Sequence, residues 1–257
     1  MALYGSRQTC EGLVLHVDRD GPVVRITLAR PERRNAFDAG LIAELHAAFA
    51  DVGDARAVVL AGEGEVFSAG ADVHWLRASL DLSAEENEAD ALRARRMFQT
   101  LDACPAPVVC RVHGAAMGGA VGLVACSDIA IAGEDAVFAL SEVRLGIIPA
   151  VISPFVVARI GPGAARRYFL TGERFGALEA FRIGLVHEVA ADLDEAVARS
   201  LEDLLAGGAE AVRAAKRLVL DDPLGDETAT RLAERRTSAE GQEGLRAFLE
   251  RRSPRWR

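Results

Sequence analysis

The sequence is almost without lysine. Lys216 is the only lysine in the 257 residues, which leaves 29 arginines among its 30 basic side chains. Any chemistry that needs a lysine amine must therefore use this one residue. A P-loop is excluded, because its lysine follows a glycine and Lys216 follows Ala215. Phosphate groups, if they are bound, must be held by arginines or by backbone amides.

Cysteines are also few, and none of them are paired in a Cys-x-x-Cys spacing. The pattern predicts reduced, buried thiols of a cytoplasmic protein, with no zinc site and no other metal centre. The four cysteines are Cys10, Cys104, Cys110 and Cys126.

Long hydrophobic runs are missing as well. The longest apolar stretch, residues 145–158, is interrupted by Pro149 and Pro154, and it is shorter than the roughly 20 residues that span a bilayer. The start of the chain has no basic segment followed by an apolar run, so no signal peptide is predicted. We therefore expect a cytoplasmic protein that does not bind membranes.

Net positive charge is absent. Thirty-eight acidic residues outnumber 30 basic ones, giving a formal net charge of −8, which argues against a nucleic-acid partner. Hydrophobic residues make up 50% of the chain, a proportion typical of a globular protein with a substantial core. No low-complexity linker divides the sequence.

A unit of buried strand, glycine-rich loop and helix occurs twice, over residues 58–76 and 108–125. A hairpin (13–17 and 23–28) and a helix over 36–52, capped by Asp38, precede the first unit, and Ser83 is predicted to cap a helix over 84–102. From about residue 161 the pattern is almost entirely helical. These helical segments are 164–170, 178–183, 193–205, 209–220 and 226–249. The chain is therefore predicted to be an α/β protein with a helical C-terminal layer.

The two glycine-rich loops do not match the common phosphate-binding motifs. A dinucleotide fingerprint starting at Gly62 and Gly64 would need glycine at position 67, which is Phe67. A Gly-x-Ser-x-Gly nucleophile elbow is also missing. Free backbone amides at the start of each following helix remain, and a pair of such donors can form an oxyanion hole.

These loops, taken with several later segments, resemble the crotonase (enoyl-CoA hydratase/isomerase) superfamily. The first loop reads Phe-Ser-Ala-Gly-Ala-Asp (67–72), and the second reads His-Gly-Ala-Ala-Met-Gly-Gly (113–119). The resemblance runs in order from about residue 12 to residue 250. Its other matching segments are 30–36, 126–129, 138–149, 168–173 and 184–186.

The resemblance implies a crotonase-type spiral of ββα repeats with a C-terminal helical trimerisation region. Residues 1–200 would form the spiral core. Residues 201–257 would be a helical region that packs on the core and on a neighbouring subunit. The expected assembly is a homotrimer or a dimer of trimers.

The resemblance also implies an acyl-CoA substrate, with no separate cofactor. The thioester oxygen would lie between the N–H groups of Ala71 and Gly119, and Glu142 would be the catalytic carboxylate. Further residues expected to contact substrate or coenzyme A are Arg33, Arg34, Ala36, Ala69, Gly70, Asp72 and Gly118. Asp72 is also expected to cap the helix that follows it.

One catalytic position departs from the family pattern. Hydratases of this family use two glutamates, and the position of the first is occupied here by Gly122. Glu142 would then carry most of the proton transfer, its pKa raised by burial next to Leu140, Val143 and Ile147. The sequence around residues 71–76 and 141–146 is similar to a branch that resembles methylglutaconyl-CoA hydratase.

We therefore expect an enoyl-CoA hydratase-type lyase that adds water to a branched 2-enoyl-CoA such as 3-methylglutaconyl-CoA. An isomerase with a single glutamate and a non-catalytic acyl-CoA-binding protein are the alternatives. The second carboxylate of 3-methylglutaconyl-CoA would need a cation or a donor. Candidates are His74, Arg77, His113 and Arg144, although His113 also fits a structural role. Separately, Lys216 could reach the coenzyme A of a neighbouring subunit.

Overall fold

The computed structural model describes residues 14–221 and 224–256. Its main sheet has six strands in the order β1-β2-β3-β4-β6-β9, antiparallel between β1 and β2 and parallel elsewhere. The strands are β1 (Leu15–Asp20), β2 (Val23–Leu28), β3 (Ala57–Gly62), β4 (Val108–Val112), β6 (Ile129–Gly133) and β9 (Glu188–Ala190). A second sheet contains β5 (Ala115–Met117), β7 (Val137–Ala139) and β8 (Arg174–Gly176).

Strands β3 and β6 of the parallel part carry no polar side chain, because both faces of the sheet are covered there. Val58 and Leu60 of β3 pack into the larger core, whereas Val59 points to the other face and packs with residues of α7. This alternation follows the two-residue period of a strand.

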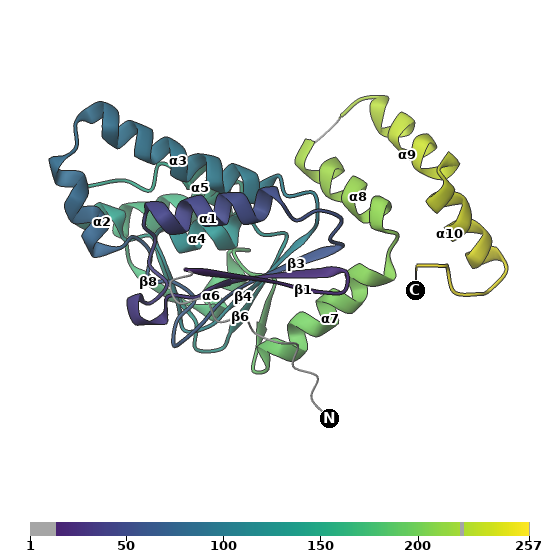
Figure 1. Ribbon diagram of the computed structural model, residues 1–257, viewed down its shortest axis with the longest axis horizontal. Helices are drawn as coiled ribbons and strands as arrows, with labels where there is room; N and C mark the ends of the chain where they lie inside the picture. Colours follow the sequence, from purple (N-terminus) through teal and green to yellow (C-terminus); the bar gives the residue numbers. More distant parts are fainter. Residues whose placement is uncertain (1–13, 222–223, 257) are drawn as a thin grey trace.

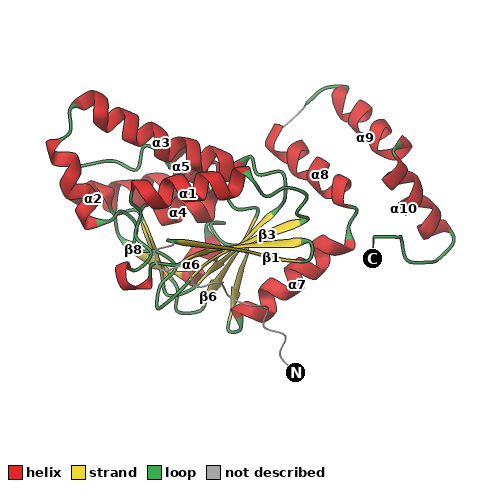
Figure 2. Cartoon of the chain, in the orientation of Figure 1, coloured by secondary structure: helices red, strands yellow, loops and turns green. Residues whose placement is uncertain are grey.

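Helices cover the two faces of the sheet unequally. Figures 1 and 2 show α1 (Ala39–Ala50), α3 (Ala84–Asp102), α4 (Gly119–Cys126) and α5 (Ser153–Thr171) grouped on one side, and α7 (Leu193–Ala206) packs on β3, β4 and β6. Two helices are short: α2 (Val73–Ala78) follows the first glycine-rich loop, and α6 (Ala177–Arg182) contacts β7, β8 and β9. The α/β architecture with a helical C-terminal region that we expected from the sequence is confirmed.

The last helices extend away from the sheet at the right of Figure 1. They are α8 (Ala209–Asp221), α9 (Glu227–Thr237) and α10 (Ala239–Leu249). The predicted division at residue 200 falls inside α7, whose Leu193, Val197 and Leu201 are buried against the sheet. The part that projects therefore starts at α8.

Local sequence signals placed most helix ends correctly. Asp38 caps α1 by accepting a hydrogen bond from the Leu41 amide, and Ser83 forms a capping box with Glu86 at the start of α3. The prediction of one helical segment over residues 226–249 was wrong. Ser238 is extended there (ψ 155°) and caps α10, so the segment forms two helices.

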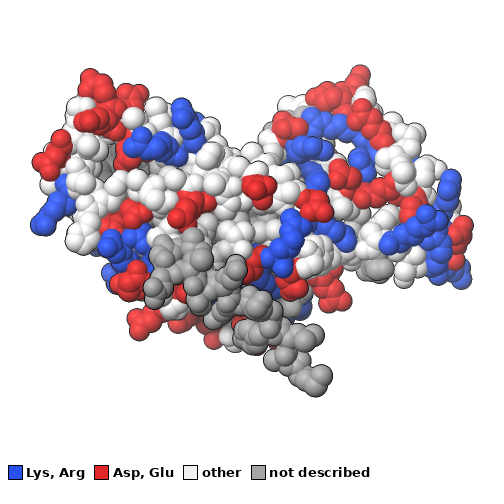
Figure 3. Space-filling model, in the orientation of Figure 1, with Lys and Arg blue, Asp and Glu red and all other residues white. Residues whose placement is uncertain are grey.

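Cys104, Cys110 and Cys126 are buried and not in disulfides, as expected, whereas Cys10 lies outside the described residues. Across the described residues, no helix is both long and apolar enough to cross a bilayer. Acidic and basic side chains are interspersed on the face drawn in Figure 3.

Candidate active site

The two glycine-rich loops lie side by side at the ends of β3 and β4. The Phe67 and Ser68 amides donate to the carbonyls of His113 and Ala115, and the Met117 amide donates back to Ser68 O. Gly70 has a φ of +86°, and a Cβ there would lie 2.7 Å from Met117 O. This close approach requires glycine.

The pairing of the loops leaves two amides free. Next to Ala71, the Gly70 amide donates to Ser68 Oγ and the Asp72 amide donates to Phe37 O. Next to Gly119, the Gly118 amide donates to Ala139 O. For the amides of Ala71 and Gly119 themselves we find no acceptor within the described part of the chain. Gly119 is the first residue of α4, where a free N–H is expected.

Glu142 begins a short 3-10 helix (Glu142–Leu145) that follows β7. Its Oε1 lies over Gly118, because a Cβ on that glycine would be 3.1 Å from this oxygen. Its Oε2 is buried and has no hydrogen-bond partner among residues 14–221 and 224–256. Burial raises the pKa of the Glu142 carboxyl above its ordinary value and outweighs a backbone hydrogen bond that acts in the opposite direction.

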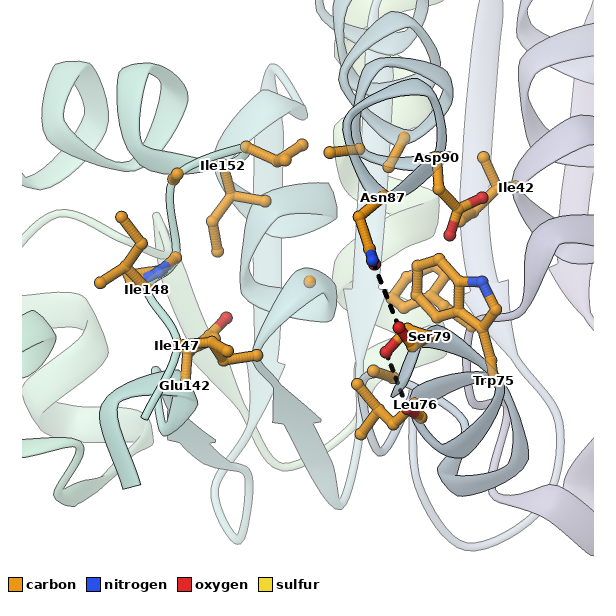
Figure 4. A pocket seen from close by; sticks show the side chains of 18 of the residues that line it. Ile42, Trp75, Leu76, Ser79, Asn87, Asp90, Glu142, Ile147, Ile148 and Ile152 are labelled. Atoms are coloured by element: carbon orange, nitrogen blue, oxygen red, sulfur yellow. Dashed lines mark hydrogen bonds between the residues drawn. The ribbon is translucent and has the colours of Figure 1, made fainter. Parts of the chain in front are cut away.

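Ala71, Gly119 and Glu142 all line one cavity of about 320 Å³, shown in Figure 4. The sequence thus predicted three residues that the fold brings together. The expected neighbours of Glu142 are only partly correct: Ile147 lines the cavity, whereas Leu140 and Val143 do not. The remaining apolar walls come from distant segments. They include Phe37, Ile42, Trp75, Leu76, Met97, Phe98, Ile148 and Ile152.

The position expected for a first glutamate is filled by other side chains. A Cβ on Gly122 would lie 2.4 Å from Ile152 Cγ2 and 2.9 Å from Phe98 Cε1. The departure at Gly122 is therefore matched by the packing around it, and an acid at this position would not fit without rearrangement.

The sequence reasoning missed three polar residues of this cavity, which are Ser79, Asn87 and Asp90. Asp90 was detectable, because it precedes Ala94 by four residues and thus lies on the buried face of α3. An acid on such a face is unusual unless it is paired or functional.

The first part of the expected coenzyme A path lies beside the first loop. Arg33 and Arg34 are exposed at the end of a 3-10 helix (Pro31–Arg33), and Ala36 is buried beneath it. The Ala69 amide donates to Arg34 O, which ties this segment to the loop.

Asp72 caps α2 as expected, with Oδ1 accepting from the His74 and Trp75 amides. Its Oδ2 lies 3.3 Å from Arg33 Nη1 and 3.7 Å from the buried Arg30. Burial alone would raise the pKa of Asp72, but these hydrogen bonds and Arg33 lower it. The side chain is thus used to hold the loop that carries the Ala71 amide.

The candidate ligands for a second substrate carboxylate lie elsewhere. His74, Arg77, His113 and Arg144 do not line the cavity. His113 is structural, because its Nε2 bonds to Gly64 O at 3.0 Å. Within the described residues, no cluster of side chains suited to a metal ion is found.

The structure does not support the expectation that Lys216 reaches a neighbouring subunit's coenzyme A. Its amine pairs with Asp128 at 2.7 Å, and its side chain is only 6% exposed. It fastens α8 to the core.

Comparison with known proteins assigns the chain to a family. The profile of the family described as Enoyl-CoA hydratase/isomerase matches residues 18–257. A Thermus thermophilus protein with a provisional enoyl-CoA hydratase name is 36% identical over 248 residues, covering 92% of this chain and 98% of its own.

Two solved structures are similar over nearly their whole length. An enoyl-CoA hydratase from Shewanella pealeana has a TM-score of 0.91 at 42% identity, covering 96% of this chain and 97% of its own. Pseudomonas aeruginosa AtuE has a TM-score of 0.92 at 39% identity, covering 95% and 99%. The chain belongs to the crotonase superfamily, in its enoyl-CoA hydratase/isomerase family.

Proposed function

We propose that this protein catalyses the reversible addition of water to a 2-enoyl-CoA, with Glu142 as its acid–base group. One observation carries the proposal. A buried carboxylate with an unpaired oxygen shares a cavity with two amides, those of Ala71 and Gly119, for which we find no acceptor among the described residues. Such an arrangement suits a reaction that forms an enolate and moves a proton next to it.

In the hydration direction, Glu142 takes a proton from water as the water oxygen bonds to C3 of the substrate. The electron pair of the C2–C3 double bond moves toward the thioester carbonyl, whose oxygen becomes negative. The Ala71 and Gly119 amides would stabilise this charge, each by roughly 3–4 kcal/mol. The protonated Glu142 then gives a proton to C2, which completes the addition.

The acyl group is proposed to be branched, on the resemblance of residues 71–76 and 141–146 to the methylglutaconyl-CoA hydratase-like branch. The apolar walls around Phe98, Ile148 and Ile152 support a hydrocarbon substituent. 3-Methylglutaconyl-CoA remains a prediction from this resemblance, and the lining of the cavity does not favour it. Among the described lining residues there is no lysine, arginine or histidine for its second carboxylate.

Coenzyme A would be bound as part of the substrate, along Arg33, Arg34 and the 69–72 loop, with no further cofactor. A trimer or dimer of trimers remains the expected assembly. The apolar groups exposed on the last helices support it. They are Leu218, Val219, Leu232, Leu245 and Phe248. Light scattering after size exclusion tests the assembly, and a monomer at assay concentrations contradicts it. A cytoplasmic location stays a prediction.

Product analysis in H₂¹⁸O tests the reaction. The purified protein is incubated with straight and branched 2-enoyl-CoA thioesters, and the products are analysed by mass spectrometry. Hydration gives a 3-hydroxyacyl-CoA that carries the label, and Glu142→Gln should reduce its rate by at least about 10²-fold. An unlabelled shifted double bond would instead identify the isomerase.

Binding without turnover would support the non-catalytic alternative. In that case an acyl-CoA should bind with the same affinity to wild type and to Glu142→Gln, and no thioester of the panel should change. Near-normal turnover by Glu142→Gln would contradict the role of this residue even if hydration is observed.

A further inference from the structure

We infer that Asp90 makes the acyl cavity select chains that carry a hydroxyl group away from the thioester, and reject chains that end in a carboxylate. The inference rests on the proposed function, since it names the kind of acyl group that the same cavity takes. It assigns a specificity-determining role to a residue outside the catalytic set.

Asp90 is placed to contact the acyl chain and not the reacting carbons. Only 8% of the residue is exposed, and it lines the same cavity as Glu142. Figure 4 shows the two carboxylates on opposite walls, with Asp90 beside Ile42 and Trp75. A chain that extends from the Glu142 side across the cavity would therefore meet Asp90.

Asp90 has one carboxylate oxygen paired with an arginine and one to spare. Its Oδ1 accepts a hydrogen bond of 2.6 Å from Arg93, whose side chain is 57% exposed and is not part of the cavity lining. For its Oδ2 we find no donor among the described residues. A substrate group that fills this valence must supply a hydrogen.

The neighbouring polar groups of this wall have already used their donors. Asn87 Nδ2 lies within 3.2 Å of the carbonyls of Ser79, Leu82 and Ser83, and Ser79 Oγ donates to Leu76 O at 2.7 Å. What remains toward the cavity is acceptor capacity on Asn87 Oδ1 and Asp90. A donor on the acyl chain could therefore pair with this wall, whereas a second acceptor could not.

A hydroxyl fits this wall better than a carboxylate does. A hydroxyl has a hydrogen that it can donate to Asp90, which lies beside Trp75 on this wall (Figure 4). A carboxylate has no hydrogen to give and would face the charge of Asp90 in an apolar cavity without a cation in its described lining.

The test compares thioesters that differ only at the end of the acyl chain. A length series of 2-enoyl-CoAs ending in methyl, hydroxyl or carboxylate is assayed for kcat and KM with wild type, Asp90→Leu and Asp90→Asn. At the length that reaches Asp90, the wild type should prefer hydroxyl over carboxylate by at least tenfold in kcat/KM. Asp90→Leu should lose the preference for hydroxyl over methyl yet still turn over the methyl-ended chain. Asp90→Asn should accept the carboxylate better than wild type.

Glu88→Gln is the matched control, because it removes an exposed acid from the same helix and should leave all three rates unchanged. Equal hydroxyl-to-methyl ratios in wild type and Asp90→Leu would overturn the inference, as would a wild-type preference for the carboxylate. Calorimetric binding of the saturated analogues separates the two proposals. If the order of affinities depends on Asp90 but no thioester is turned over, the hydratase function is refuted and the selectivity stands. If hydration is observed but does not depend on the chain end, the selectivity is refuted and the hydratase function stands.

Discussion

The Glu142 carboxylate occupies the space next to Gly118, because its Oε1 would lie 3.1 Å from a Cβ at that position. Gly118 also has φ +52° and ψ −119°, a conformation that is open to glycine and strained for other residues. We predict that Gly118→Ala lowers kcat by at least tenfold, because the added methyl displaces the carboxylate and strains the turn that carries Gly119. Steady-state kinetics with the best thioester would measure this loss.

Gly21→Ala is the control for Gly118→Ala, because it strains the backbone without displacing the Glu142 carboxylate. Gly21 has a similar φ of +56° in the turn between β1 and β2, and a Cβ there meets nothing within 4 Å. It should lose stability on substitution and keep kcat. If both variants kept kcat, the contact between Glu142 and Gly118 would have no catalytic importance.

The raised pKa of Glu142 predicts the pH dependence of hydration. The base must be ionised to accept a proton from water, so kcat/KM should fall as the pH decreases through the raised pKa of this carboxyl, above the ordinary 4.5. A pH–rate profile measures this limb. A limb at or below 4.5 would mean that Glu142 is not desolvated in the working enzyme.

The same burial predicts a stability cost. A carboxyl whose pKa is raised in the folded state stabilises the fold below its unfolded pKa, and this contribution is lost as the pH rises through the folded pKa. Glu142→Gln should therefore unfold at a higher temperature than wild type near neutral pH. The difference should shrink as the pH falls toward 4.5 and below. Thermal melts at several pH values test this, and an equal difference at every pH would rule it out.

Packing against Gly122 should be detectable by a double-mutant cycle. Gly122→Ala places a methyl on Ile152 and Phe98 and should cost about 1–3 kcal/mol of unfolding free energy. Ile152→Ala removes the Cγ2 atom that would lie at 2.4 Å. The double variant should therefore lose less than the sum of the two single changes. If the losses of unfolding free energy were strictly additive in denaturant unfolding, Ile152 and Phe98 would have moved to accommodate the added methyl without cost.

The cap of α2 should influence substrate binding through the Ala71 amide. Asp72→Ala removes the acceptor for the His74 and Trp75 amides and one partner of the buried Arg30. It should cost about 1 kcal/mol or more of unfolding free energy and raise KM. Asp72→Asn keeps a cap oxygen and should be milder.

Asp192→Ala is the control for that change. Asp192 caps α7 through the amides of Asp194 and Glu195 and does not line the cavity. It should reduce stability without changing KM. A rise in KM of the same size in both variants would show that the effect is general loss of stability.

Local patterns were sufficient to predict what depends on short stretches of chain. Asp38, Ser83 and Asp72 were predicted as helix caps because their signal is complete within four residues. The glycine loops with Ala71 and Gly119 were identified by motif, and their free amides follow from their position at helix starts.

The walls of the cavity could not be predicted, because they depend on side chains that meet only after folding. Ile152 and Phe98 close the space next to Gly122 from two different helical segments. Ser238 divides a pattern that looked continuous, since a serine can either continue a helix or cap one. Asp90 was detectable by its place on the buried face of α3, but its neighbours Ile42 and Trp75 were not.

The burial of Lys216 has a chemical consequence for a protein of this kind. Thioesters acylate free amines, and the sequence contains a single lysine, whose amine is bound to Asp128 and to the carbonyl of Ala106. Because this side chain is only 6% exposed, the chain offers no reachable lysine to an activated acyl group. We expect no acyl-lysine to form at prolonged exposure to high concentrations of acyl-CoA, where lysine-rich proteins accumulate such adducts.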